Sequence, residues 1–187
     1  MVLLALGTAS GCGVGTQSEP VRLDPERVPF GLNTVGPTTT TRPEAPQGRA
    51  VARIFLVGPD GLLVARERRL PGPLTPGAAL RTLRAGPDDE ERRSGLTTAL
   101  PPEVPVQYLG VREAVARVRL TAAFTGGSVR RQAIALAEIV YTLTEIEGIE
   151  RVAFVIGDDV VEVPRADGSL TAEPVGRADY ARFAPQG

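Results

Sequence analysis

Residues 128–156 read SVRRQAIALAEIVYTLTEIEGIERVAFVI and predict the longest helix of the chain followed by its most apolar strand. From Ser128 to Glu147, apolar residues recur every three or four positions, which is typical of an amphipathic α-helix, and Gly148 follows as a helix-ending residue. The polar strip of this helix is narrow, so we expect the helix to pack closely against a sheet. The strip consists of Glu138, Thr142 and Glu145.

The segment after this helix predicts a central strand. Val152–Ile156 is apolar at every position, as expected for a strand that is covered on both faces, and Gly157–Asp159 supplies turn residues. Val160–Val163 predicts a further strand, which Pro164 ends. The tail, Ser169–Phe183, has enough apolar residues to pack as an irregular segment or a short helix.

The first part of the domain predicts a hairpin and a short helix. Ala50–Val57 and Leu62–Arg68 are branched, apolar runs on either side of a Gly-Pro-Asp-Gly turn. Thr75 and Pro76 are typical of the start of a helix, and Gly86 is placed to end it.

A second short helix is predicted after Pro87, with an acidic first turn at Asp88–Glu91 and Gly95 at its end. Val104–Val111 and Ala114–Thr121 are predicted as two strands joined by a tight turn, and apolar residues alternate with arginines in the second of them. These elements together predict an α+β two-layer sandwich, in which two main helices cover one largely antiparallel sheet of five or six strands.

The composition excludes most catalytic devices. The chain of 187 residues has no histidine, and all 21 of its basic residues are arginine. It therefore lacks an imidazole base, a His-ligated zinc site and a lysine for a Schiff base or a P-loop, and we expect no catalytic residue, no metal and no cofactor. The formal net charge of -1 gives no broad positive field, so we expect no nucleic-acid partner.

The first residues resemble the lipobox of a bacterial lipoprotein signal. Val2–Leu6 is apolar, Gly7–Gly11 is made of small residues, and Cys12 is the only cysteine. In such signals the thiol receives a lipid, which replaces the cleaved hydrophobic segment as the membrane anchor. We therefore predict that residues 1–12 are a signal peptide and that Cys12 is the lipidation site. The apolar run is short and no basic residue precedes it, from which we expect a start codon further upstream.

A disordered tether is predicted for residues 13–48. This segment is rich in Gly, Pro and Thr and has no helical or strand period, so it buries too little apolar surface to offset the entropy of ordering it. It would hold the domain at residues 49–187 away from the extracytoplasmic face of the cell membrane. The alternative is that the first residues are a cytosolic tail with a chance cysteine.

Several motifs, in this order, resemble the GerMN domain of sporulation and spore germination proteins. They cover roughly residues 50–183 and are Leu83–Pro87, Gly95–Pro101, Gln132–Ala133, Ala137–Leu143, Gly148–Ile149, Val152–Val155, Gly168–Leu170 and Arg177–Tyr180. The resemblance implies an extracytoplasmic α/β domain with a ring-building-motif-like fold and no known enzymatic activity. It also implies an assembly or interaction module at the cell envelope, in sporulation, germination or envelope signalling.

Four arginines form the predicted partner-contact surface. Arg117 and Arg119 lie on the polar face of a predicted strand, and Arg130 and Arg131 begin the long helix. Together they would make a basic patch suited to teichoic or lipid phosphates. The simpler interpretation is that all four are solvated ends of a strand and a helix.

The acidic residues have structural interpretations and catalytic alternatives. Asp88–Glu91 suits the start of a helix, although four adjacent acids could also hold a metal or act in catalysis. Asp158 and Asp159, with Glu162 or Asp167, could supply the two carboxylates of a glycan hydrolase. The turn alone explains two adjacent aspartates.

The sequence therefore predicts a non-enzymatic, membrane-anchored lipoprotein whose GerMN domain recruits an envelope or membrane protein through an exposed sheet edge or face. A carboxylate-based cell-wall glycan hydrolase and a small-ligand-binding lipoprotein are the alternative functions.

Overall fold

The predicted hairpin is the first element of the computed structural model, which describes residues 50–100 and 103–186. β1 (Val51–Val57) and β2 (Leu63–Arg69) pair antiparallel and form a two-stranded sheet of their own. In the turn between them Gly61 has a φ of +81°, a conformation that side chains with a Cβ rarely adopt. The Gly-Pro-Asp-Gly stretch is therefore a turn, as predicted.

α1 (Pro76–Arg84) and α2 (Asp89–Arg93) begin where the sequence predicts two helices. The hydroxyl of Thr75 accepts a hydrogen bond of 3.2 Å from the backbone N–H three residues later. Asp88 and Glu91 form a capping box, in which each side chain accepts a hydrogen bond from the backbone N–H of the other residue. Both caps satisfy N–H groups that the first turn of a helix leaves unpaired.

The central sheet has four strands in the order β3-β4-β5-β6. Its strands are β3 (Gln107–Arg112), β4 (Val115–Leu120), β5 (Arg151–Ile156) and β6 (Asp159–Val160). Glu113 and Ala114 form the tight turn between β3 and β4, with φ of +52° and +61°. β4 and β5 are parallel, because the long connection between them contains a helix that returns the chain to the same end of the sheet.

A third, small sheet pairs β7 (Val163–Pro164) with β8 (Leu170–Thr171). The prediction of one sheet with five or six strands is therefore wrong, because the strands are divided among three sheets. The predicted strand Val160–Val163 is also divided: its first residue pairs with β5, and its last pairs with Thr171. The prediction of mainly antiparallel pairing is confirmed, since β4 and β5 are the only paired strands that run parallel within residues 50–100 and 103–186.

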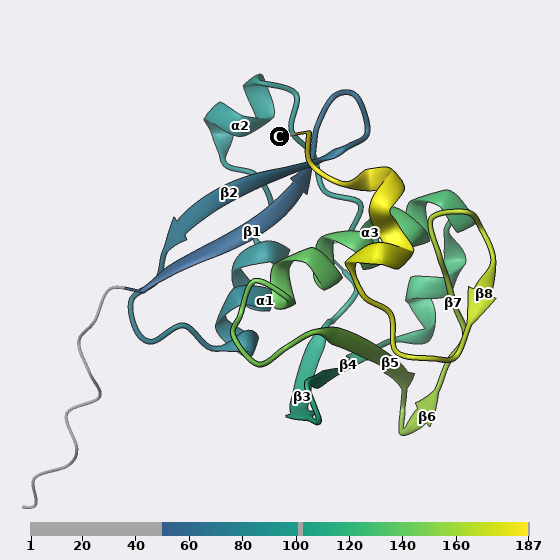
Figure 1. Cartoon of the computed structure of the whole chain (residues 1–187). Helices are drawn as coiled ribbons and strands as arrows, with labels where there is room; N and C mark the ends of the chain where they lie inside the picture. Colours follow the sequence, from purple (N-terminus) through teal and green to yellow (C-terminus); the bar gives the residue numbers. More distant parts are fainter. Residues whose placement is uncertain (1–49, 101–102, 187) are drawn as a thin grey trace, which may run out of the picture. The chain divides into compact units, whose positions relative to one another are not determined.

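The long helix α3 (Val129–Leu143) lies in the middle of the domain, with β1, α1, β5 and β7 packed around it (Figure 1). The Ser128 hydroxyl accepts a hydrogen bond from the first turn, as expected of an N-cap. The helix ends four residues before Glu147, where the Thr144 hydroxyl donates to the carbonyl of Val140 at 2.8 Å. Ten of its fifteen residues are buried, so α3 is enclosed rather than laid on one sheet.

Because α3 is enclosed, most of its predicted polar strip lies in the interior of the domain. Glu138 and Thr142 are both 0% exposed. The polar strip of a helix normally faces solvent, but at these two positions strands and loops pack against that side of the helix as well. Glu145 is half-buried and forms ion pairs with Arg53 (3.7 Å) and Arg177.

Two 3-10 helices complete the described part of the chain. η3 (Ala122–Gly126) leads into α3, and η4 (Arg177–Phe183) is the helical segment of the tail. Tyr180 is fully buried, and its hydroxyl donates to the carbonyl of Pro164 at 3.1 Å. The prediction of a packed tail with a short helix is confirmed.

Cys12, the predicted signal peptide and the predicted tether at residues 13–48 lie outside the described residues. Within residues 50–100 and 103–186, none of the helices combines the length and the apolar character that crossing a bilayer requires.

Candidate functional site

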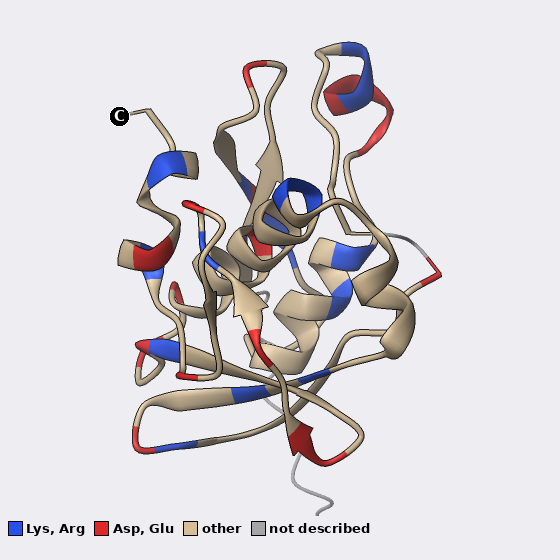
Figure 2. Cartoon of the chain, turned by 90° about the vertical axis from the view of Figure 1, so that its right-hand side faces the viewer, with Lys and Arg blue, Asp and Glu red and all other residues tan. Residues whose placement is uncertain are grey.

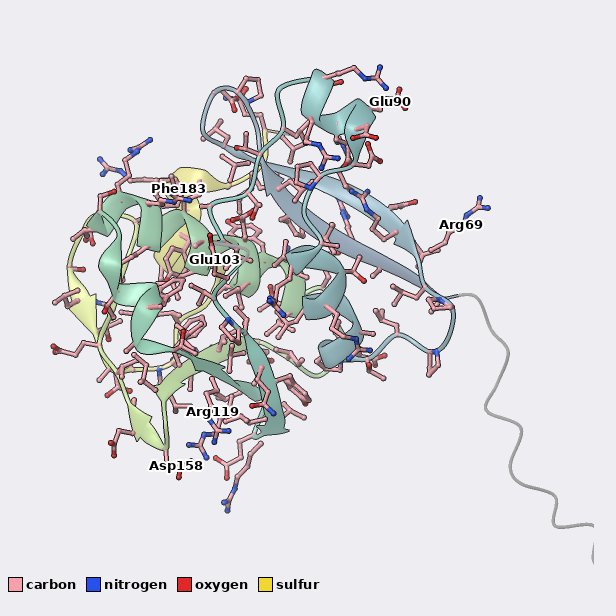
Figure 3. The ribbon with its side chains drawn as sticks, turned by 180° about the vertical axis from the view of Figure 1, so that it is seen from behind. Arg69, Glu90, Glu103, Arg119, Asp158 and Phe183 are labelled. Atoms are coloured by element: carbon pink, nitrogen blue, oxygen red, sulfur yellow. The ribbon has the colours of Figure 1, made fainter. Side chains whose placement is uncertain are left out.

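Arg117 and Arg119 lie on the outer face of the central sheet, as their alternation predicts. Arg119 donates to the carbonyl of Gly157 at 2.9 Å and forms an ion pair of 2.9 Å with Asp158. Figure 3 shows the side chains of Arg119 and Asp158 next to each other. Arg117 is exposed and has no hydrogen-bond or ion-pair partner among the described residues. Their neighbours on β4 face the core and are Ala116, Val118 and Leu120.

An apolar side chain shares this outer face, and the sheet has an open strand edge at β3. Arg119 is opposite Val155 in β5, which is opposite Val160 in β6, so the three side chains share one side of the sheet. Val160 is 56% exposed. On its other edge, β3 pairs with no strand in the described part of the chain, and a bulge between Tyr108 and Gly110 interrupts its pairing with β4. We call Arg117, Arg119, Val160 and the free edge of β3 the outer sheet surface.

Arg130 and Arg131 occupy a different part of the domain. The guanidinium of Arg130 lies 5.8 Å from the centroid of the Phe183 ring, and Arg131 Nε donates to the carbonyl of Ala99 in a long hydrogen bond of 3.5 Å. Figure 3 shows Phe183 and Arg119 on opposite sides of the domain. The structure therefore places the four predicted arginines in two separate places rather than in one patch.

Charged residues of both signs are interspersed over the described elements. Figure 2 shows blue and red segments scattered over the described elements, with no large region of a single sign. Binding of a partner through this domain would therefore depend on local groups rather than on a broad field.

The acidic stretch at Asp88–Glu91 serves the structure of α2, as the macrodipole interpretation predicts. Glu91 forms ion pairs with Arg66 (3.4 Å) and Arg68 from β2. Burial alone would raise the pKa of Glu91, but the hydrogen bond from Arg68 and the capping bond from Asp88 outweigh it and lower that pKa. Glu91 thus links α2 to the hairpin through part-buried contacts.

Two of the four carboxylates considered for hydrolysis, Asp158 and Asp167, have local partners, whereas Asp159 and Glu162 are exposed. Asp158 pairs with Arg119, and Asp167 accepts hydrogen bonds from the backbone and hydroxyl of Ser169 at 2.9 and 2.7 Å. These bonds lower the pKa of Asp167 and are typical of an Asx turn. Among the residues that the structure describes, no three His, Cys, Asp or Glu side chains are grouped so that they could hold a metal ion.

Glu138 is a buried carboxyl that the sequence did not single out as special. Its Oε2 accepts hydrogen bonds from the backbone N–H of Ala99 (2.8 Å) and the hydroxyl of Thr98 (3.2 Å), which joins α3 to the loop that follows α2. Its Oε1 is buried without a hydrogen-bond partner in the described residues. Thr142, one turn further along, accepts a hydrogen bond from the backbone N–H of Phe55 in β1 (3.2 Å).

Burial raises the pKa of Glu138 from 4.5 to about 8, even though its hydrogen bonds from Ala99 and Thr98 act in the opposite direction. The carboxyl is therefore mostly neutral at pH 7 in the folded protein. The proton belongs on Oε1, because Oε2 already accepts two hydrogen bonds. A neutral, buried carboxyl in this position is a structural cross-link.

A cavity of about 320 Å³ lies at the start of α3, and its residues include Glu103, Phe124, Arg131 and Gln132. Arg131 was predicted as a contact residue and Gln132 was recognised only as part of a family motif, whereas Glu103 and Phe124 were not predicted. Glu103 belongs to a loop that is distant in sequence from α3, so no local pattern could have indicated that it lines the same cavity.

Comparisons with known proteins agree with this fold. The family model Germane, described as sporulation and spore germination, matches residues 37–162. The first GerMN domain of the sporulation protein GerM from Bacillus subtilis is similar with a TM-score of 0.55 and 21% sequence identity, covering 69% of this chain and 98% of that domain.

The tandem GerMN domains of the same Bacillus subtilis protein are similar with a TM-score of 0.55 and 19% identity, covering 71% of this chain and 48% of theirs. This chain therefore spans about half the length of the tandem structure. At these identities the likeness concerns the fold alone. No curated protein matches the sequence.

Proposed function

Because this chain belongs to the sporulation and spore germination family of the Germane model, we propose that it is a lipid-anchored, non-enzymatic GerMN module that recruits a protein partner at the extracytoplasmic face of the cell membrane. The process it serves would be sporulation, germination or envelope signalling. The proposal has two separable parts, the anchor and the contact surface.

The anchor is Cys12, followed by the tether at residues 13–48. Support for it comes from the sequence, in which small residues precede the only cysteine and a Gly-, Pro- and Thr-rich segment follows it. A diacylglyceryl group on this thiol would hold the protein at the membrane through its acyl chains.

Changing Cys12→Ala, or blocking signal cleavage with globomycin, tests the anchor. The variant should move from the membrane fraction to the soluble or secreted fraction, with the domain still folded. If wild type and Cys12→Ala fractionate in the same way, the anchor is disproved, whatever the result for the contact surface.

The contact surface is the outer sheet surface, and the observation that carries it is the combination of groups found there. Arg117 is exposed without a partner in the described residues, Val160 is exposed on the same side of the sheet, and the outer edge of β3 pairs with no strand in the described part of the chain. Exposed arginine and apolar side chains suit a protein contact formed by patch packing, and an open strand edge suits one formed by strand addition.

Photo-crosslinking in living cells tests this surface. A photoreactive amino acid at position 117 should give a discrete adduct with an envelope protein, which mass spectrometry can identify. Position 93 is the matched control, because Arg93 is also an exposed arginine but lies on α2. Equal adducts from both positions, or none from position 117, would contradict the proposed contact surface.

A further inference from the structure

The cavity at the start of α3 carries a pair of opposite charges that the protein itself leaves unmatched. Its lining includes Ala99 and Glu103, together with residues of η3, of the connection from η3 to α3 and of the first turns of α3. Its volume of about 320 Å³ is at the lower end of the range for ligand pockets. It is therefore large enough for a small organic molecule.

Arg131 supplies the positive group. Its Nε donates to the carbonyl of Ala99 at 3.5 Å, whereas its two terminal nitrogens have no partner among the described residues. Arg131 is exposed and lines the cavity, so these two nitrogens are accessible to a ligand. Two free, parallel N–H groups of a guanidinium are suited to a carboxylate, which they bind in a bidentate manner.

Glu103, which lines the same cavity, supplies the negative group. Within the described residues it has no hydrogen bond and no ion pair, and it does not pair with Arg131 although both line the same cavity. Glu103 is exposed, and Figure 3 shows it away from the ion pair of Arg119 and Asp158. A carboxylate without a partner would accept hydrogen bonds from an ammonium group.

Gln132 adds a fixed acceptor. Its Nε2 donates to the carbonyls of Thr125 (3.1 Å) and Gly127 (2.8 Å), which settles the orientation of the amide and leaves Oε1 to accept a hydrogen bond. The apolar part of the cavity is formed by Phe124, which is 6% exposed, together with alanine side chains. This part can cover a small aliphatic group.

We propose that this cavity binds a small zwitterion, a free amino acid or a dipeptide, whose carboxylate pairs with Arg131 and whose ammonium group pairs with Glu103. A simple anion would pair with Arg131 but would be repelled by the carboxylate of Glu103. A simple amine would pair with Glu103 but would be repelled by the guanidinium of Arg131. The site goes beyond partner recruitment and does not depend on the membrane anchor.

The test is a titration of the full-length Cys12→Ala protein, followed by the amide resonances of Gly126 and Gly127 in heteronuclear NMR. The probes are L-alanine, L-leucine and L-alanyl-L-alanine, each compared with its N-acetyl and its C-terminal amide derivative. We expect saturable shifts with a Kd of roughly 0.1–1 mM for at least one free zwitterion. Both derivatives should bind at least about tenfold more weakly, because each lacks one charge.

Two variants locate the binding. Arg131→Gln and Glu103→Gln should each raise the Kd of the tightest-binding probe at least about tenfold. Glu103→Gln should also remove the preference for the free amine over the N-acetyl form. Arg130→Gln is the matched control, since Arg130 contacts Phe183 outside this cavity and should leave the Kd unchanged.

Three results would overturn the proposal. The first is the absence of a saturable shift with any of the three probes up to about 20 mM, a concentration well above the expected Kd. The second is equal binding of the N-acetyl form and the free amino acid to the wild-type site. The third is unchanged binding in Arg131→Gln.

Discussion

β4 and α3 both carry polar residues at regular spacing. Those of β4 point to solvent, whereas two of those on α3 are buried in the interior. The arginines of β4 point to solvent, where Arg119 forms an exposed ion pair with Asp158. Glu138 and Thr142 of α3 point inward, where each accepts hydrogen bonds from a neighbouring segment. A polar strip thus shows which residues share a face of an element. The elements packed around it decide whether that face is exposed to solvent or buried.

The difference has energetic consequences. A polar group in water exchanges partners freely, so losing one contact costs little. A buried polar group has no water to replace its partner, so losing that partner costs the full desolvation of the group that remains. Substitutions on α3 should therefore be far more damaging than equivalent substitutions on β4.

The largest effect is expected for Glu138→Ala. This change leaves the backbone N–H of Ala99 and the hydroxyl of Thr98 without their acceptor and opens a cavity beside α3. We expect a loss of about 4–5 kcal/mol in the free energy of unfolding at pH 6, measured by urea denaturation. Glu147→Ala, at an exposed position just after the helix, should change it by less than about 0.5 kcal/mol. Equal effects of the two changes would mean that Glu138 is solvated.

The second prediction concerns pH. Between the ordinary pKa of 4.5 and the folded value of about 8, the folded protein holds a proton on Glu138 that the unfolded chain has released. Stability must therefore fall as the pH rises through this window, by about 3 kcal/mol between pH 5 and pH 8. The carboxyls with lowered pKa values, Asp88, Glu91 and Asp167, titrate below this window.

Glu138→Gln sharpens this prediction. The amide oxygen keeps the acceptor for Ala99 and Thr98 but does not ionise, so the pH dependence should disappear and the variant should be more stable than wild type at pH 8.5. Denaturation curves of both proteins at pH 5, 7 and 8.5 provide the measurement. Parallel pH profiles for the two proteins would show that Glu138 is charged throughout.

A smaller loss is expected for Thr142→Val, which keeps the shape of the side chain but removes the acceptor for the backbone N–H of Phe55. Leaving that N–H unpaired should cost about 1–2 kcal/mol in urea denaturation. Thr97→Val is the control, because Thr97 is exposed, and should be close to neutral. A neutral Thr142→Val would indicate that another acceptor replaces the hydroxyl.

The smallest effect is expected on the outer sheet surface. Arg119→Ala removes an ion pair whose acidic partner, Asp158, is 95% exposed, so the cost should not exceed about 0.5 kcal/mol. A double-mutant cycle with Asp158→Ala measures the coupling between the two side chains directly. A coupling above about 1 kcal/mol would remove the contrast between β4 and α3.

Several features of the fold could be predicted because their causes are local. The caps at Thr75 and Asp88, the glycine in the β1–β2 turn and the alternation along β4 each depend on residues within a few positions of one another. The four arginines could be recognised as surface residues for the same reason. That they form two groups rather than one could not be predicted, because the angle and distance between β4 and α3 are not encoded in either segment alone.

The sequence by itself determined where most helices and strands begin, which residues of β4 face outward, and the family to which the chain belongs, since these depend on local hydrogen bonding, side-chain period and motif order. Tertiary structure alone decided that the strands divide among three sheets, that Glu138 is buried and neutral, and that Glu103 and Arg131 line one cavity. The physical reason is that pairing and burial depend on contacts between segments far apart in the chain. A local pattern restricts such contacts but does not select among them.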